Sequence, residues 1–333
     1  MWWTGATFKE LVATGKIAPL DDVWEQMISS GQYEKATQDL FKVDGKTYAV
    51  PLSVSRWVVL YNKKMFADNG LAEPKTWDDL MKAAEKLKSA GITPFEATVQ
   101  EGWRGFIWFE ELMIRTDPKA YKGLHDGSVP YDSAAVQKAF QLWSDMYAKG
   151  YFTDPRSNEE AQDFARGKAA MYLIGEWAEG IVENAGLKAD SGFGAFIMPN
   201  VDPNLPPSVI VEAGPIVVST AGKEKKDVMT AVNFWTSVDG ANVWAKASGN
   251  FEGNIKGARP QPDRRQDLGR HEGQQLRADG TLVGGRAAGP AGRTRGRTQR
   301  LPGQSDHGQC EGDHGPHAGA ERRLLGVQAM TAP

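Results

Sequence analysis

Tryptophan stands beside a charged residue or a second tryptophan at four places that do not fit a regular helix or strand interior. The four clusters are Trp2–Trp3, Arg56–Trp57, Trp103–Arg104 and Glu176–Trp177. An indole can stack on the apolar C–H face of a sugar ring, while carboxylate and guanidinium groups hydrogen-bond the hydroxyls at its rim. The clusters therefore favour binding of a sugar.

The same tryptophans have a structural interpretation, because most tryptophans lie largely buried in hydrophobic cores. Six are assigned to the core from their apolar surroundings: Trp24, Trp77, Trp108, Trp143, Trp235 and Trp244. Loop or strand-end positions favour ligand contact for Trp3, Trp103 and Trp177. For Trp2 and Trp57 the two interpretations are evenly balanced.

No catalytic motif accompanies these clusters. The sequence has no GxSxG elbow, HExxH helix, Walker loop or GxGxxG turn. A glycosidase pair of carboxylates stays open, with candidates Glu101, Glu110, Glu111, Glu176 and Glu212. His125 stands among Gly and Asp residues and is interpreted as a solvated loop residue.

The C-terminal part holds two motifs that could suggest other ligands. His307, Cys310, His314 and His317 could approach a metal, and residues 293–300 read RTRGRTQR. Glycine flanks nearly every candidate ligand, and the spacing matches no common zinc module. We expect no metal, no cofactor and no nucleic acid.

Composition limits the possible functions further. The 333 residues are enough for about two domains. The formal net charge of −3 argues against nucleic acid or an anionic membrane as the main partner. Cys310 is the one cysteine, so a disulfide framework is excluded, and no apolar run reaches the roughly 18 residues of a membrane span. The first residues lack the basic and apolar regions of an export signal.

Helix and strand patterns alternate along the chain up to about residue 250, which predicts an α/β fold with a largely parallel sheet. Asp44-Gly45 predicts a hairpin turn. Thr76 and Asp79 predict a capping box. Helices are expected over 8–15, 21–29, 63–69, 77–90, 132–149, 227–236 and 240–247, and strands over 57–61, 169–174, 209–211 and 216–219.

The composition changes abruptly at Ala258. From there to Pro333 the chain has no Phe, Tyr, Trp or Lys. Such a segment has almost nothing with which to form a core. We expect residues 258–333 to be disordered and to result from translation of the gene in a shifted reading frame. In support, Met330-Thr331 is encoded ATG-ACN, so the frame that starts one base later contains the stop codon TGA.

An ordered set of short segments resembles the extracellular solute-binding proteins of bacterial ABC sugar importers, from Trp2 to about Gly257. The segments read WWTG, GKIAPLDD, DGKTYAVPLSV, LYNKKMF, KTWDDL, GITPF, GKAAM and IGEW. The resemblance implies two α/β lobes joined by crossing strands, the type II periplasmic-binding-protein architecture, with ligand held between the lobes. The first lobe would be residues 1–55 and 213–257, incomplete at its N-terminus, and the second 56–212.

The resemblance also implies site residues. Trp3, Trp103 and Trp177 match positions where the family places sugar-contacting aromatics. Pro51–Arg56 and Glu212–Pro215 match the two interlobe crossings, so Arg56 and Glu212 become candidates. The complete candidate set is Trp2, Trp3, Arg56, Trp57, Trp103, Arg104, Glu176, Trp177 and Glu212.

Three functions remain open at this point. The first is a monomeric sugar receptor that works outside the cytoplasmic membrane, in the periplasm or at the cell surface, and delivers its ligand to the permease of an ABC importer. The second is a glycoside hydrolase, and the third a receptor for a non-sugar ligand. Several tryptophans at strand ends favour a sugar over an iron chelate, which would need Tyr, His and carboxylate oxygens.

Overall fold

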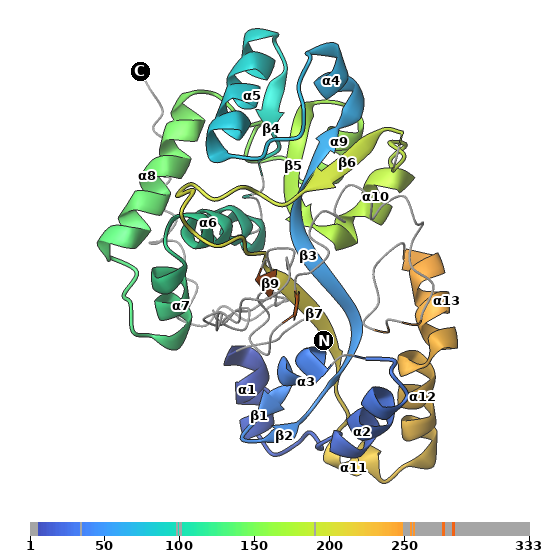
Figure 1. Ribbon diagram of the computed structural model, residues 1–333. Coiled ribbons are helices and arrows are strands. Elements are labelled where there is room, and N and C mark those ends of the chain that lie inside the picture. Colours follow the sequence, from blue (N-terminus) through green and yellow to red (C-terminus); the bar gives the residue numbers. More distant parts are fainter. Residues whose placement is uncertain are drawn as a thin grey trace, which may run out of the picture.

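The computed structural model describes residues 6–33, 35–97, 99, 102–189, 191–248, 254 and 256, and two short strands at 275–276 and 282–283. Most of these residues form two bodies, one above the other in Figure 1, and strand β3 (Val50–Asn62) runs from one into the other. Strand β7 (Val211–Ile216) pairs with the lower half of β3. The upper lobe is defined here as residues 57–210, and the lower lobe as the described residues up to 56 and from 211 to 256.

Helices surround the strands in both lobes (Figure 1). The lower lobe holds α1 (Ala6–Ala13), α2 (Asp21–Ser29), α3 (Lys35–Asp39), β1 (Lys42–Val43), β2 (Lys46–Thr47), α11 (Thr220–Lys223), α12 (Lys226–Thr236) and α13 (Val238–Ser248). The upper lobe holds α4 (Lys63–Asp68), α5 (Trp77–Ser89), β4 (Thr93–Phe95), α6 (Trp103–Thr116), α7 (Pro118–Asp126), α8 (Ala134–Ala148), α9 (Glu160–Ala165), β5 (Ala169–Gly175), the 3-10 turn η1 (Glu176–Ala178), α10 (Glu179–Asn184) and β6 (Phe193–Phe196).

Local sequence signals explain several of these elements. Thr76 and Asp79 form the expected capping box at the start of α5. Asn62 caps α4 by accepting from the backbone N–H of Met65. Asp44 and Gly45 have φ angles of 48° and 81°, the left-handed pair that a tight hairpin between β1 and β2 needs. These predicted elements are confirmed.

The sheet is mostly antiparallel in the part of the chain that the structure describes, which corrects the expected parallel sheet. Its order is β4-β5-β3-β6, with β7 also on β3. Strand β3 is antiparallel to β5, β6 and β7, and β4 with β5 is the parallel pair. Helices separate β3, β4, β5 and β6 along the chain. However, β5 lies between β3 and β4 in the sheet, and β3 lies between β5 and β6, so among these four strands β4 and β5 alone are both consecutive and adjacent.

The second interlobe strand is longer than the sequence suggested. Two strands were expected, at 209–211 and 216–219, but β7 runs unbroken over Val211–Ile216. Pairing with β3 supplies hydrogen bonds that outweigh the poor strand propensity of Gly214 and Pro215. Pro215 lies opposite Pro51, where the register of the ladder shifts, and such irregular positions are where a sheet tolerates proline.

Two separate hydrophobic cores stabilise the molecule. The upper core gathers the second half of β3 with β5 and helices α5, α6 and α8, and includes Trp57, Trp108 and Leu173. The lower core includes Trp24 and Phe41. On β3, Val50 belongs to the lower core and Trp57 to the upper core. Ile210, just before β7, belongs to the upper core, and Ala213 of β7 belongs to the lower core. At that boundary the backbone N–H of Trp57 donates to the carbonyl of Ile210 at 2.9 Å.

The fold agrees with the expected two-lobed α/β architecture. The expectations for residues 258–333, including the metal and arginine motifs, fall outside the described residues except for β8 (Gln275–Leu276) and β9 (Leu282–Val283), which pair antiparallel. Within the described part of the chain, no helix combines the length and the apolar character needed to cross a bilayer.

Candidate functional site

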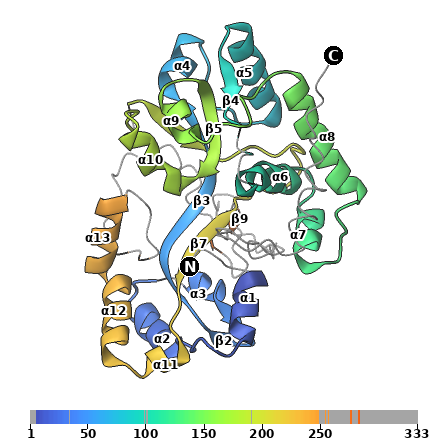
Figure 2. The ribbon, with the colours of Figure 1, turned by 180° about the vertical axis from the view of Figure 1, so that it is seen from behind.

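The candidate site lies where β5 ends beside the crossing strands β3 and β7. Gly175, the last residue of β5, pairs with Trp57 of β3. The chain then turns at once into η1, which carries Glu176 and Trp177. In both ribbon views α6 lies beside this junction (Figures 1 and 2). Residues far apart in the sequence therefore meet at the level where the two cores divide.

Arg56 and Glu176 form an ion pair at this junction. Nε of Arg56 donates to both carboxylate oxygens at 3.0 and 3.1 Å, and Nη2 donates to Oε1 at 2.5 Å. The Glu176 side chain is only 1% exposed, against 27% for Arg56. Burial alone would lower the pKa of Arg56, but the charge and hydrogen bonds of Glu176 raise it above its ordinary value. The guanidinium of Arg56 is therefore charged at any physiological pH.

Trp177 and Glu212 lie against the same glycine. A Cβ added to Gly175 would overlap the indole of Trp177 and approach Oε1 of Glu212 to 2.9 Å. Ser55 sits opposite Glu212 in the β3–β7 ladder, and its hydroxyl accepts from the backbone N–H of Trp177 at 3.2 Å. Trp177 and Glu212 are half-buried. The edge of the Trp177 indole and the Glu212 carboxylate thus come together at Gly175, and the half-buried indole also packs against the upper core.

The structure corrects the inclusion of Trp57 among the ligand-contacting residues. Its side chain is 1% exposed and belongs to the upper core. The indole stacks on the ring of Phe106 in α6, with centroids 6.1 Å apart. Strand alternation explains the difference, because Ser55 and Trp57 are buried while Arg56 between them is half-buried.

The Trp103–Arg104 cluster begins a helix and is not part of a loop as expected. Trp103 is the first residue of α6, after Gly102 with φ of 75°, and its side chain is outside the described part. Nε of Arg104 lies 3.3 Å from Oε1 of Glu160 in α9, and both side chains are largely buried. Arg104 therefore ties the start of α6 to α9. Trp2 and Trp3 lie outside the described residues.

Two of the other carboxylates considered for catalysis, Glu110 and Glu111, make structural contacts in the upper lobe. Oε2 of Glu111 accepts a hydrogen bond from Nε of Arg115 at 2.8 Å, and both side chains are fully buried. Glu110 accepts from the hydroxyl of Tyr121 at 3.2 Å, and burial raises its pKa to about 8, with the charges of Glu111 and Glu212 acting in the same direction. Glu101 is outside the described residues.

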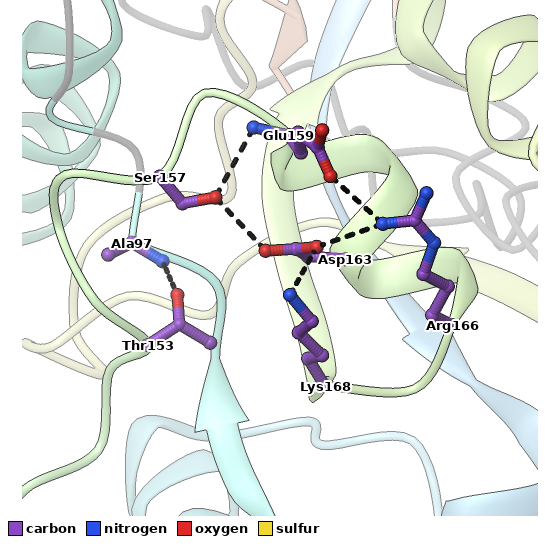
Figure 3. A network of polar contacts seen from close by, with 7 residues as sticks. All are labelled: Ala97, Thr153, Ser157, Glu159, Asp163, Arg166 and Lys168. Carbon is purple, nitrogen blue, oxygen red and sulfur yellow. Dashed lines mark hydrogen bonds and ion pairs between the residues drawn. The ribbon is translucent and has the colours of Figure 1, made fainter.

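Sequence reasoning did not find a polar network in the upper lobe (Figure 3). Asp163 of α9 accepts a hydrogen bond from the hydroxyl of Ser157 at 3.0 Å, and its carboxylate lies 2.8 Å from Nζ of Lys168. Nearby Glu96 is fully buried after β4, and burial raises its pKa to about 8, with the charges of Asp163 and Glu160 adding to the rise. No local sequence signal marks Glu96, because its burial depends on strand pairing. No described group of acidic, histidine or cysteine side chains is arranged to hold a metal.

His125 also differs from its sequence interpretation. It lies in the last turn of α7 rather than in a loop, and its ring makes an edge contact with Tyr121 at 4.9 Å between centroids. Its Nε2 is 3.8 Å from Oε1 of Glu110, and its side chain is 11% exposed. The helical spacing of Tyr121 and His125 was a signal for this contact.

The model of a protein family described as bacterial extracellular solute-binding protein matches residues 1–266. The chain belongs to this family. Among relatives of this solute-binding protein, an uncharacterised ABC transporter extracellular-binding protein of Pyrococcus horikoshii is 28% identical over 204 residues, which are 59% of this chain and 45% of that protein. The multiple sugar-binding protein of Streptococcus mutans is 27% identical over 229 residues, 62% of this chain and 53% of that protein. The solute-binding protein therefore spans about half the length of these relatives.

Solved structures agree with the two-lobed fold of the solute-binding protein. A chitin oligosaccharide binding protein matches with a TM-score of 0.67 and 25% identity, covering 81% of this chain and 69% of that one. A solute-binding protein in complex with raffinose matches with a TM-score of 0.66 and 16% identity, covering 81% and 72%. The second likeness concerns the fold alone.

Proposed function

We propose that this solute-binding protein is a substrate receptor of an ABC importer and captures a sugar between its lobes. The observation that carries the proposal is the meeting of the Trp177 indole with the Glu212 carboxylate at the end of β5, where the two cores divide. An indole offers a stacking surface, and a carboxylate beside it can accept hydrogen bonds from sugar hydroxyls.

Further support comes from what relatives bind. Relatives and structural neighbours are named for multiple sugars, diacetylchitobiose and chitin oligosaccharides. A receptor of this kind would act outside the cytoplasmic membrane, and its partners would be the permease subunits that accept the ligand. Capture between lobes joined by two paired strands gives the permease two shapes to distinguish, open and closed.

The alternative of a glycoside hydrolase has less support. A hydrolase needs one carboxyl group that can give up a proton and a second one across the scissile bond. Glu176 is held by the guanidinium of Arg56, and Glu111 by that of Arg115. Buried carboxylates held in ion pairs fix structure and are poorly suited to donate protons. A non-sugar ligand remains the alternative within the same family, since one relative is named for osmoprotective compounds.

A titration tests the proposal. The full chain is titrated with N,N′-diacetylchitobiose, raffinose and galactose while tryptophan fluorescence and heat are recorded. We expect saturable binding of at least one sugar, because Trp177 is both the platform and a probe. Release of reducing ends on prolonged incubation would instead support the hydrolase, and absence of binding across a wide sugar panel would overturn the proposal. Small-angle scattering at saturation should show a smaller radius of gyration if the lobes close.

A further inference from the structure

The charges beside Trp177 are mostly negative. Glu176 follows Gly175 directly, Glu212 lies against the same glycine, and the charge of Glu179 acts on Arg56 from the next turn. We propose that this site selects sugars without an acidic group, either neutral or amino-bearing, and that Glu212 is the residue that sets this preference. The inference rests on the proposed sugar-binding function and adds the charge class of the ligand.

The positive groups of the candidate site are already engaged by carboxylates. The guanidinium of Arg56 donates to both oxygens of Glu176. That of Arg104 lies against Glu160, whose side chain is only 3% exposed. Recognition of a ligand carboxylate or phosphate depends on a guanidinium fork or a similar donor that turns toward the ligand. At either arginine, turning would leave a buried carboxylate without its counter-charge, which is costly.

Glu212 adds a negative charge at the stacking surface itself. Its position is fixed by the β3–β7 ladder, opposite Ser55, whose hydroxyl also holds the backbone of Trp177. A ring stacked on the indole therefore has the Glu212 carboxylate close to its edge. Burial is the main cause of the raised pKa of Glu110 in α6, and the charge of Glu212 adds to it.

Opposite consequences follow for the two classes of ligand. Hydroxyl and ammonium groups donate hydrogen bonds to a carboxylate, so neutral and amino sugars gain from Glu212. A uronate or a phosphate brings a like charge to a half-buried place where water screens poorly, and the repulsion weakens its binding.

Matched probes test the inference. The full chain is titrated with galactose and galacturonate, with N,N′-diacetylchitobiose and chitobiose, and with sn-glycerol 3-phosphate, each at low and at high salt. We expect the acidic probes to bind at least about 10-fold more weakly than the best non-acidic probe, with the gap narrowing as salt screens the repulsion.

Two variants separate charge from shape. Glu212→Gln keeps the size of the side chain and removes its charge, so the affinity for acidic probes should rise by about 10-fold while amino sugars lose affinity. Glu224→Gln, at an exposed site of the lower lobe, is the control and should leave the gap unchanged. Thermal melts confirm that both variants fold.

The outcomes distinguish the two proposals. Tightest binding of an acidic probe, or an unchanged gap in Glu212→Gln, would overturn the charge preference and leave sugar reception intact. If no sugar of either class bound, the proposed function and this inference would both fall.

Discussion

Arg56 and Glu176, 120 positions apart in the sequence, are joined through main chain and side chain at once. The backbone N–H of Arg56 donates to Oε2 of Glu176 at 2.9 Å, while the guanidinium of the same arginine holds both carboxylate oxygens. The buried carboxylate of Glu176 thus fixes both the backbone of β3 at Arg56 and the direction of the Arg56 side chain. It does so at the point where β3 passes between the lobes.

The first prediction concerns this ion pair. Glu176→Gln removes the negative charge and offers one acceptor where the carboxylate offers two, so Arg56 loses its fixed direction. We expect ligand affinity to fall by roughly 10-fold and stability by less than the ~3–5 kcal/mol of a fully buried pair, because the Arg56 charge left unmatched is only half-buried. Calorimetric titration and denaturant unfolding measure the two effects. Glu159→Gln breaks an exposed pair with Arg166 and is the control. Wild-type values for Glu176→Gln would contradict the proposed positioning.

The second prediction concerns the stacking surface. Trp177→Ala removes an aromatic face worth ~1–3 kcal/mol, so affinity should fall by roughly 10- to 100-fold, while Trp177→Phe should keep part of it. Trp108→Phe, in the middle of the upper core, should lower stability and leave affinity unchanged. If Trp177→Ala lowered only the melting temperature, Trp177 would be a core residue and no platform.

The third prediction concerns Gly175. Its backbone has φ of −72° and ψ of 147°, which any residue adopts, so alanine there meets no backbone strain. The added methyl would instead push against Trp177 and Glu212. We expect Gly175→Ala to weaken binding and to cost about 1–3 kcal/mol of stability through overpacking. Gly105→Ala, where the methyl would meet only ordinary contacts of 3.8–3.9 Å, is the stability control. Equal behaviour of the two variants would argue against the close packing at Gly175.

The fourth prediction concerns pH. Burial raises the pKa of Glu96 to about 8, well above the 4.5 of the unfolded chain. The folded state therefore holds this proton more tightly, and the stability that it contributes is lost as pH rises from about 4.5 to about 8. Glu96→Gln removes this dependence. Its melting temperature should exceed that of the wild type at pH 8.5 and differ little near pH 4.5, whereas Glu224→Gln should show no such change. A wild-type profile for Glu96→Gln would mean that Glu96 is charged in the folded state.

The elements that local chemistry specifies were predictable from sequence. The capping box of α5 and the Asp44-Gly45 turn depend on residues within four positions of each other. The order of strands was not predictable, because β5 pairs with β3 across more than 100 residues. The sequence pattern of alternating strands and helices does not reveal whether two consecutive strands pair, as β4 and β5 do, or are separated by another strand, as β3 and β4 are.

The candidate site was predictable in part, for a similar reason. The sequence pointed to Arg56, Glu176, Trp177 and Glu212, which the structure brings to one junction. It could not separate Trp57 from them, because an aromatic residue in a strand serves the core or the surface according to which face the pairing register buries. Ser55 gave no signal at all, since its contact with Trp177 exists only through that register.

The hydrogen bond between Trp57 and Ile210 joins the first and the last residue of the upper lobe. The chain enters this lobe and leaves it at the same point, so residues 57–210 hold both ends of their own core. The lower lobe lacks this independence, because its core joins residues near the start of the chain to Ala213, Val218 and Val232. During synthesis on the ribosome, the upper lobe therefore has its whole core once residue 210 has been made. The lower lobe, whose first residues are made earlier, can complete its core only after β7 and α12 have been made.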